Sequence, residues 1–500
     1  MKIETFFSHW NLRENPFTAE EARDDDVYAR IMSDGVAHPE FEKIFGRPER
    51  PSTSVVFGEK GSGKTALRLL MEQRLKEYNE NNPRKKTWIV RYDEWNHMVD
   101  RTVGAENADD PEAFKRIRLE DHIDKMISMV VTEIIDAASR PTSSKVSKEL
   151  CKSLRRMPRQ HRLDLAYLTI LYDQPSLSTR GERWRKISKV LRVGSLITPS
   201  KLLYLFGAGA MITFLSALDL TTFGGLLGYY SMGAAAFGGL LTFIGGWFGI
   251  SSAWANHKRR KTIQEELKVV DHPGSALFNQ LGSIKAAELD SLPMPTPGDQ
   301  DCRYELLGRL QRILKNLDFV SITVLVDRVD EPSLVNGNGK KMRNLIWPLF
   351  SHKILQQDGL GIKMLLPIEL GYELKREDGE FFSKARLDKS NLIERLEWTG
   401  VNLYDICNHR VKAVYEGESE PTLLKDLFEE RVSVQDLVDA LDQMKQPRDA
   451  FKFLYEVIIQ HCKGSTDAEP EFLIPKLTLE QARRKQAQRV QDLARGFSAA

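Results

Sequence analysis

The hydrophobic pattern is dominated by an almost uncharged stretch in the middle of a strongly charged chain. Residues 202–256 contain one charged residue, Asp219, and the basic segments RWRKISKVLR and HKRRK lie on either side. A helix needs about 20 apolar residues to cross a bilayer, so the pattern predicts two membrane-spanning helices near residues 202–218 and 230–250. Because positive charge lies at both ends and not at the turn, both ends are expected in the cytoplasm.

Glycine makes up nine of the 27 residues between positions 224 and 250. The pairs Gly224-xxx-Gly228 and Gly245-xxx-Gly249 would allow two helices to approach closely. The alternative is a glycine-rich hairpin buried in a soluble core. Such a core needs partner helices that are apolar all round, whereas the other expected helices are amphipathic, so we expect the membrane-embedded hairpin.

A second pattern lies upstream, where TSVVFGEKGSGKTALRLL reads as a short strand, a glycine-rich turn and a helix. Residues 58–65 fit G-x-x-x-x-G-K-[ST] at every fixed position. In such a loop the backbone N–H groups wrap phosphates, and the N-terminus of the helix adds partial positive charge. Lys64 would reach the β- and γ-phosphates, and Thr65 would bind Mg²⁺. The predicted nucleotide-binding residues are Gly58, Glu59, Lys60, Gly61, Ser62, Gly63, Lys64, Thr65 and Ala66.

An acidic strand end follows the uncharged stretch, in FVSITVLVDRVDEP. The apolar run 322–326 predicts a buried parallel strand. Asp327 at its end is placed to hold Mg²⁺ through water. Glu331 is expected to orient the attacking water, with Asp330 as the alternative base.

These motifs and their order resemble the KAP and NACHT groups of P-loop NTPases. In those groups the second strand ends in an acidic residue, two others, then Asp with Glu or Arg, and residues 327–331 keep this spacing, with Arg328 where a second Asp is common. KAP proteins carry transmembrane helices inside the NTPase domain, between the two motifs. TWIVRYDEWNHM is also similar to an aromatic-rich strand end of the family.

A local similarity concerns the N-terminus. FFSHWNLRENPF followed by HPEFEKIF is similar to the approach to the P-loop in ExeA-type secretion ATPases. Those proteins place their membrane helix after the ATPase domain, so this similarity covers the N-terminal segment alone.

The KAP resemblance implies an α/β fold, with a P-loop NTPase parallel sheet, a helical insert, a two-helix transmembrane hairpin and a C-terminal helical lid region. It implies a membrane-anchored enzyme that hydrolyses ATP with Mg²⁺ to drive a conformational or assembly switch, in phage defence or membrane-associated signalling. The alternative is a slow-hydrolysing, nucleotide-gated scaffold in envelope or secretion-system assembly. The expected location is the inner membrane, with two spans and with both termini and the NTPase domain in the cytoplasm.

The predicted organisation has seven parts. They are an N-terminal approach segment (1–50), the first part of the NTPase core (51–103), a helical insert (104–200), the transmembrane hairpin (201–256), a helical return and loop (257–300), the second part of the core (301–410) and a C-terminal helical region (411–500).

Several further residues are candidates for sensing or completing the site. The strand GIKMLLPIEL offers Lys363 or Glu369 as a polar sensor. Arg448, in QPRDAFKFLYEVI, resembles the sensor-2 arginine of AAA-type lids, although Pro-Arg-Asp at a helix start also fits plain capping. The candidate arginine fingers in a multimer are Arg343, Arg386 and Arg395.

Composition adds limits on partners. The 500 residues carry a net charge of +2, which does not indicate nucleic-acid binding. The four cysteines lie far apart, without metal-ligand spacing, as expected for reduced thiols. The expected partners are a membrane and either further copies of the chain or a partner protein. No base-specific motif separates ATP from GTP.

Overall fold

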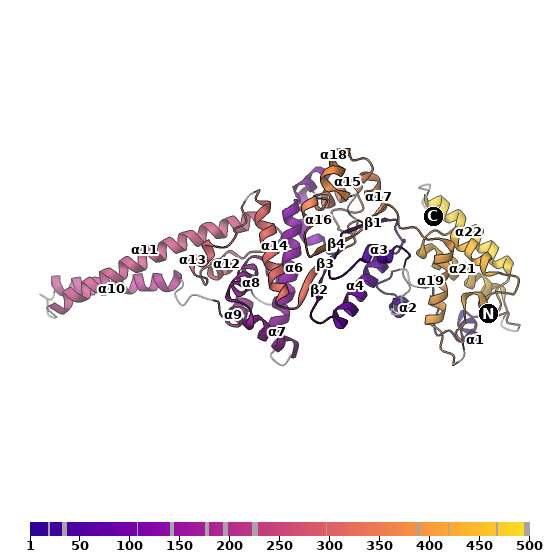
Figure 1. Cartoon of the computed structure of the whole chain (residues 1–500), viewed down its shortest axis with the longest axis horizontal. Helices are drawn as coiled ribbons and strands as arrows, with labels where there is room; N and C mark the ends of the chain where they lie inside the picture. Colours follow the sequence, from indigo (N-terminus) through magenta and orange to yellow (C-terminus); the bar gives the residue numbers. More distant parts are fainter. Residues whose placement is uncertain are drawn as a thin grey trace. The chain divides into compact units, whose positions relative to one another are not determined.

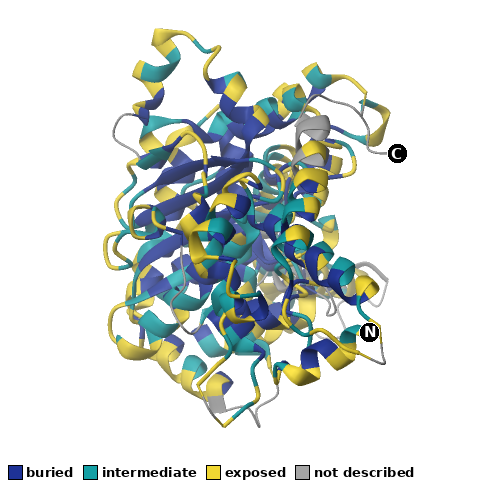
Figure 2. Ribbon diagram, turned by 90° about the vertical axis from the view of Figure 1, so that its right-hand side faces the viewer, coloured by how far each residue is buried: buried dark blue, intermediate teal, exposed yellow. Residues whose placement is uncertain are grey.

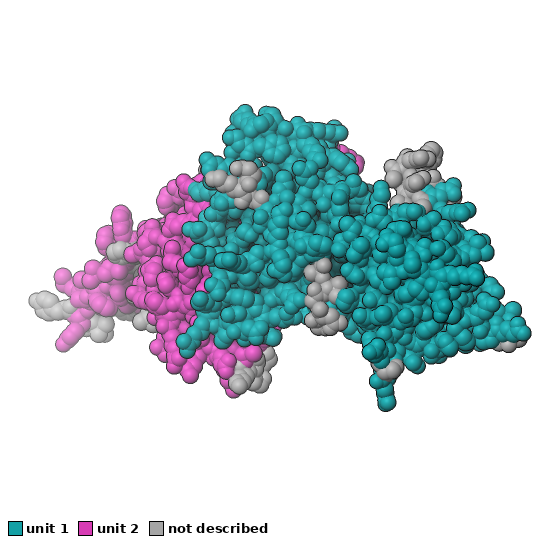
Figure 3. Space-filling view, turned by 45° about the vertical axis from the view of Figure 1, so that its right-hand side comes forward, with its two compact units in different colours: residues 1–95, 321–500 teal, residues 96–320 magenta. Residues whose placement is uncertain are grey.

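The computed structural model describes most of the 500 residues. The residues outside the description are 19–20, 33–37, 108, 141–144, 176–179, 194–198, 223–228, 297, 388–390, 419, 467–468 and 495–500. The chain divides into two compact units, coloured separately in Figure 3. Unit 1 comprises residues 1–95 and 321–500, and unit 2 comprises residues 96–320. Unit 2 is therefore an insertion in the chain of unit 1.

Unit 1 is built on a five-stranded parallel sheet with the strand order β2-β3-β4-β1-β5 (Figure 1). The strands are β1 (Ser54–Gly58), β2 (Lys86–Tyr92), β3 (Phe319–Val326), β4 (Leu360–Pro367) and β5 (Asn391–Ile393). Every residue of β1 and β4 is buried, as Figure 2 shows by colour. This burial explains their continuous apolar sequence, because a parallel sheet is covered on both faces. The α/β class predicted from the sequence is confirmed.

Helices cover both faces of this sheet. On one face, Val56 of β1 and Leu365 of β4 belong to the same apolar cluster as Phe41 of α3 (Phe41–Phe45) and Leu70 of α4 (Lys64–Asn81). On the other face, α17 (Ile368–Leu374) places Gly371 against the Phe57 ring, where an added Cβ would lie 3.2 Å from it. The strands bury alternate side chains in opposite directions, so both helical layers contribute to the core.

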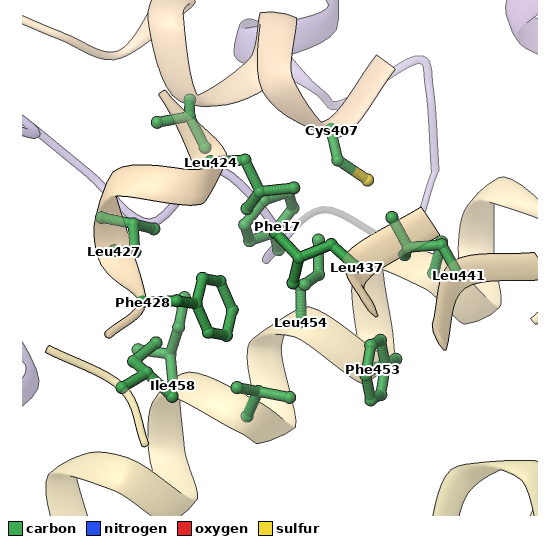
Figure 4. Close-up of a cluster of buried hydrophobic side chains, with 14 of the residues drawn as sticks. Phe17, Cys407, Leu424, Leu427, Phe428, Leu437, Leu441, Phe453, Leu454 and Ile458 are labelled. Atoms are coloured by element: carbon green, nitrogen blue, oxygen red, sulfur yellow. The ribbon is translucent and has the colours of Figure 1, made fainter. Parts of the chain in front are cut away.

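The C-terminal helices of unit 1 form a second core together with the N-terminus. Helix α1 (Ile3–His9) contacts α21 (Pro447–Gly464), and α2 (Asp26–Ile31) contacts α19 (Gly400–Ala413). Figure 4 shows Phe17 among side chains from the C-terminal helices, including Leu437 and Phe453. The remaining helices of unit 1 are α15 (Gly339–Ile346), η4 (Trp347–Leu349), α16 (His352–Leu355), α18 (Gly379–Ala385), η6 (Leu424–Leu427), α20 (Val434–Asp442) and α22 (Lys476–Ala494).

The described residues of unit 2 are predominantly helical. Its elements are α5 (Asn96–Thr102), η2 (Ala105–Asn107), η3 (Pro111–Arg116), α6 (Leu119–Ser139), α7 (Lys145–Arg156), α8 (Arg159–Tyr172), α9 (Arg180–Leu191), α10 (Pro199–Thr222), α11 (Tyr229–Glu266), α12 (Gly274–Leu281), α13 (Ala286–Asp290) and α14 (Gln300–Lys315). Helices α6, α8 and α14 contact one another and form its core.

The uncharged stretch forms the two packed helices α10 and α11, but the transmembrane prediction is wrong. Within the described part of the chain, no helix combines the length and the hydropathy that a membrane crossing requires. The two-span inner-membrane location is therefore not supported. The stretch is uncharged without being strongly apolar, because a third of residues 224–250 are glycine. In addition, α11 continues through the basic run 257–261 to Glu266.

Two glycines other than the predicted pairs bring the helices of this hairpin together. Gly209 of α10 and Gly238 of α11 bring the two backbones into contact, since a Cβ on Gly209 would lie 2.6 Å from the Thr242 nitrogen. Gly224 and Gly228 lie outside the described residues. The hairpin is not a buried core either, because many of its large apolar side chains are exposed.

A buried charge network occupies the core of unit 2. Asp124 of α6 accepts a hydrogen bond from the Tyr172 hydroxyl at 2.7 Å, and its other oxygen lies 3.5 Å from Arg303 Nε. Both Asp124 and Arg303 are almost fully buried. Burial raises the pKa of Asp124 to about 7, although Arg303 opposes this shift.

We expect Asp124 to make unfolding dependent on pH. The folded carboxyl keeps its proton below pH 7, whereas the unfolded one is ionised, so stability from this group falls as pH rises. Between pH 6 and 8 the loss is about 1.4 kcal/mol. The measurement is the free energy of unfolding of wild type and Asp124→Asn at both pH values.

Burial lowers the pKa values of His272 and Lys363, so their contributions to stability rise with pH, opposite to that of Asp124. Because both proteins contain these groups, the difference in unfolding free energy between wild type and Asp124→Asn isolates Asp124. Asp100→Asn, at an exposed position of α5, should keep the wild-type pH dependence. If the difference in unfolding free energy between wild type and Asp124→Asn did not change with pH, the raised pKa of Asp124 would be contradicted.

Candidate functional site

The glycine-rich loop joins the end of β1 to the start of α4. Gly61 and Gly63 have φ values of +97° and +88°, which glycine adopts without the steric cost of a Cβ. A Cβ on Gly61 would also lie 2.9 Å from Gln446 Oε1 and 3.1 Å from the Arg448 Cβ. The turn then enters α4 at Lys64, so the N–H groups of the first helical turn face the loop.

Lys64 lies in the centre of this loop. Its Nζ donates to the carbonyl oxygens of Gly58 at 2.8 Å and Glu59 at 2.9 Å. Burial lowers the pKa of Lys64, and the nearby carboxylates of Asp330 and Asp327 oppose that shift. The ammonium group is thus held at the loop by carbonyl groups, which are weaker partners than a phosphate would be.

Asp327 follows the last residue of β3 and meets the start of α4. Thr65 Oγ1 donates to Asp327 Oδ2 at 3.0 Å. Arg68, one turn further along α4, places its Nε 3.4 Å from the same oxygen. Asp327 and Arg68 are 1% and 3% exposed. Burial raises the pKa of Asp327, and the Arg68 charge and the Thr65 hydrogen bond counteract the shift.

The segment after β2 supports this strand end. Trp95, which is 2% exposed, donates its indole N–H to the Asp327 carbonyl at 2.9 Å and stacks on Tyr92. Asp93 forms ion pairs with Arg23 at 2.9 Å and with Arg68 at 3.7 Å. The aromatic-rich segment therefore positions Asp327 and its cationic neighbour.

Asp330 and Glu331 lie on the turn that follows Asp327, in different surroundings. Arg328 has a left-handed backbone, with φ +60°, and its guanidinium forms an ion pair with Glu331. Asp330 accepts the Gly337 N–H at its backbone carbonyl, at 3.0 Å. Among the carboxylates that act on Lys64, Asp330 has the largest effect. The base expected first, Glu331, is thus already paired, and the alternative base faces the loop.

A region formed by residues 395–398, after β5, and by the start of α21 contacts the loop from outside. Trp398 donates its indole N–H to the Ser62 carbonyl at 2.9 Å. The Glu59 carboxylate binds both the Arg395 guanidinium and the Gln446 amide. The Arg448 N–H at the start of α21 points to the Gly61 carbonyl at 3.5 Å. This region is placed as a lid on the loop.

These groups surround one pocket of about 640 Å³ within unit 1. Its polar lining includes Lys64, Thr65, Asp327, Asp330 and Arg448. Its apolar and aromatic lining includes Tyr28, His38, Leu70, Trp398, Ile406 and Phe451.

Several polar side chains of the pocket lining already form hydrogen bonds within the protein. The Tyr28 hydroxyl donates to the Ala66 carbonyl at 2.7 Å, and His38 Nε2 lies 2.8 Å from the Glu397 carbonyl. Arg410 binds both carboxylate oxygens of Asp25, at 2.6 and 3.0 Å. A flat base could therefore contact the aromatic and aliphatic side chains of the lining.

Most of the predicted site residues meet at this pocket. Those that line it are Lys60, Gly61, Gly63, Lys64, Thr65, Ala66, Asp327, Asp330, Glu331, Glu369 and Arg448. Gly58, Glu59 and Ser62 belong to the loop but do not line the pocket. Lys363 pairs with Ser54 at the start of β1, so it lies four residues, or about 13 Å, before the end of β4. It is therefore distant from the site.

The candidate arginine fingers have different environments. Arg343 binds Glu377, and Arg395 binds Glu59. Arg386 is exposed and ends α18 with φ +46°. Sequence reasoning missed Arg68, Trp398, His38 and the Arg410–Asp25 pair. For Arg68 a signal existed, since it lies four residues after Lys64 on the buried side of α4.

The donor set fits a nucleotide with Mg²⁺. A hydroxyl and a carboxylate at a phosphate-binding loop are typical Mg²⁺ ligands, with phosphate and water completing the shell. Arg448 lines the pocket, and its Nε is buried and has no hydrogen-bond partner among the described residues. An orphaned donor of this kind suits an anionic ligand in the pocket.

Comparison with known proteins gave no relative. No family model, no curated protein and no solved structure matches this chain. The functional argument therefore rests on the geometry of the pocket.

We expect Trp95→Phe to destabilise the protein by about 1–3 kcal/mol, because it leaves the buried Asp327 carbonyl without its donor. The measurement is urea unfolding followed by circular dichroism. Tyr372→Phe, at a position that is 54% exposed, should change stability by less than about 0.5 kcal/mol. Equal effects of the two substitutions would show that the indole hydrogen bond does not stabilise the strand end.

Proposed function

We propose that this chain is a P-loop NTPase that binds ATP with Mg²⁺ and hydrolyses it. The observation that carries the proposal is the Thr65–Asp327 hydrogen bond of 3.0 Å beside Lys64. It brings a phosphate-binding loop and an acidic strand end to one pocket, at the carboxyl ends of parallel strands, where ligands of such sheets bind. The KAP resemblance supports the same assignment.

Each residue then has a defined role. The N–H groups of the loop and Lys64 would bind the β- and γ-phosphates, and Arg448 would contact the γ-phosphate from the lid side. Mg²⁺, held by Thr65 and through Asp327, would neutralise charge on the phosphates. Arg68 opposes the effect of burial on the pKa of Asp327, because an opposite charge nearby favours the charged carboxylate.

We assign the general base to Asp330 and keep Glu331 as the alternative. Asp330 faces the loop and acts on Lys64, whereas Glu331 is bound by Arg328. For Glu331 to accept a proton from water, this ion pair would first have to open.

The second candidate function is a nucleotide-gated scaffold with slow turnover. Two observations favour it, namely the Arg328–Glu331 pair and the lid contacts of Glu59 and Ser62. Hydrolysis would then require the Arg328–Glu331 ion pair or the contacts of Glu59 and Ser62 to open first, as in a switch.

Nucleotide binding should depend on Lys64. We expect Lys64→Ala to weaken ATP binding at least 100-fold, since the loop loses its charged phosphate ligand. Isothermal titration calorimetry with a non-hydrolysable ATP analogue and Mg²⁺ measures it. Lys384→Ala, an exposed change on α18, is the matched control. Unchanged affinity in Lys64→Ala would remove the P-loop assignment.

Turnover by Asp330→Asn and Glu331→Gln identifies the base. We expect Asp330→Asn to lower kcat about 100-fold or more while ATP binding persists, and Glu331→Gln to lower it less than 10-fold. The reverse order would assign the base to Glu331. Tight binding with no turnover in the wild type would favour the scaffold.

A further inference from the structure

Helix α11 carries a continuous row of exposed positions at heptad spacing. The row, which we name the α11 seam, consists of Tyr230, Gly233, Phe237, Leu240, Ile244, Trp247, Ser251 and Trp254, with successive steps of 3, 4, 3, 4, 3, 4 and 3 residues. All eight positions are exposed, and the six large side chains are between 38% and 85% exposed.

The seam lies on the side of α11 that faces away from α10. Helix α10 contacts α11 at Gly238 and Thr242, where the backbones approach closely. At 100° per residue, Leu240 and Ile244 each lie about 160° from Thr242 around the helix. Gly233 has open space where its Cβ would be. The hairpin is therefore complete without the seam.

This spacing is the pattern of a helix that packs against another helix. Apolar residues repeating every 3.5 positions keep one face toward a partner through a left-handed supercoil. The six large side chains expose roughly 700 Å², taking about 200 Å² for a fully exposed aromatic ring. Stable interfaces bury about 600–1,000 Å² on each partner, so the exposed area of the seam falls within this range.

The order of the seam residues identifies the partner. Read from either end, the seam gives the same series of large and small residues, centred on position 242. Antiparallel pairing therefore places Tyr230 opposite Trp254, Gly233 opposite Ser251, Phe237 opposite Trp247 and Leu240 opposite Ile244. An antiparallel pair of identical helices related by a two-fold axis is isologous, so each of these contacts occurs twice.

Charge favours the same arrangement. The seam itself is uncharged, but the basic run 257–261 follows it directly. Parallel helices would place the two basic runs side by side. Antiparallel helices separate them by about 50 Å along the axis, well beyond the Debye length of about 8 Å. We propose that the α11 seam binds the same seam of a second copy of this chain, antiparallel, and so forms a homodimer.

Disulfide trapping tests the pairing. In a Cys151→Ser background, differently tagged full-length chains carrying Phe237→Cys or Trp247→Cys are co-expressed and oxidised. The other three cysteines are buried. We expect a disulfide-linked dimer that contains both tags, and little cross-linking when either variant is expressed alone. Parallel pairing would instead cross-link each variant with itself, which would overturn the proposal.

Molar mass in solution provides the second readout. Light scattering should give about twice the chain mass of 57.1 kDa for wild type and the monomer mass for Leu240→Gln/Ile244→Gln. The control Met232→Gln/Ile250→Gln removes exposed apolar side chains of α11 outside the seam and should remain dimeric. A monomeric wild type would overturn the proposal. Flotation of that monomer with phosphatidylethanolamine–phosphatidylglycerol vesicles would identify lipid as the occupant instead.

Discussion

The hydrogen bond between Thr65 and Asp327 is the constraint on which unit 1 depends. It joins residues that are 262 positions apart in the chain, and it forms only if β3 returns to the sheet in the correct register after the insertion. The register is fixed on both sides of β4, where Val326 pairs with Met364 and Gly58 pairs with Pro367. One strand thus separates the loop strand from the acidic strand.

The insertion leaves and rejoins this sheet at neighbouring strands. Trp95, the last residue before unit 2, donates to the carbonyl of Asp327, and the Asp327 N–H donates to Tyr92 at 3.3 Å. Since β2 and β3 are parallel, the insertion leaves the sheet at the carboxyl end of β2, beside Asp327, and re-enters it at Phe319, at the opposite edge. Strand β3 then brings the chain back across the sheet to Asp327.

Local motifs were predictable from the sequence, and long-range contacts were not. The loop, its strand and α4 follow from eight adjacent residues, and the acidic strand end follows from one apolar run. The lid contacts join Glu59 to Gln446 and Ser62 to Trp398, 387 and 336 residues apart, and no periodicity encodes such pairs. The transmembrane prediction failed for another reason. It counted missing charges, whereas membrane insertion depends on apolar side chains, which glycine lacks.

The pocket and the α11 seam differ in charge. Lys64 and Arg448 supply cations within one chain, while Arg343 and Arg395 are already bound to Glu377 and Glu59. The pocket lining already contains six cationic side chains, Arg23, Lys60, Lys64, Arg328, Arg410 and Arg448. The α11 seam is uncharged, so the seam residues themselves offer no charged group to a phosphate. The proposed dimer would raise the local concentration of the chain, because two linked copies meet other partners together.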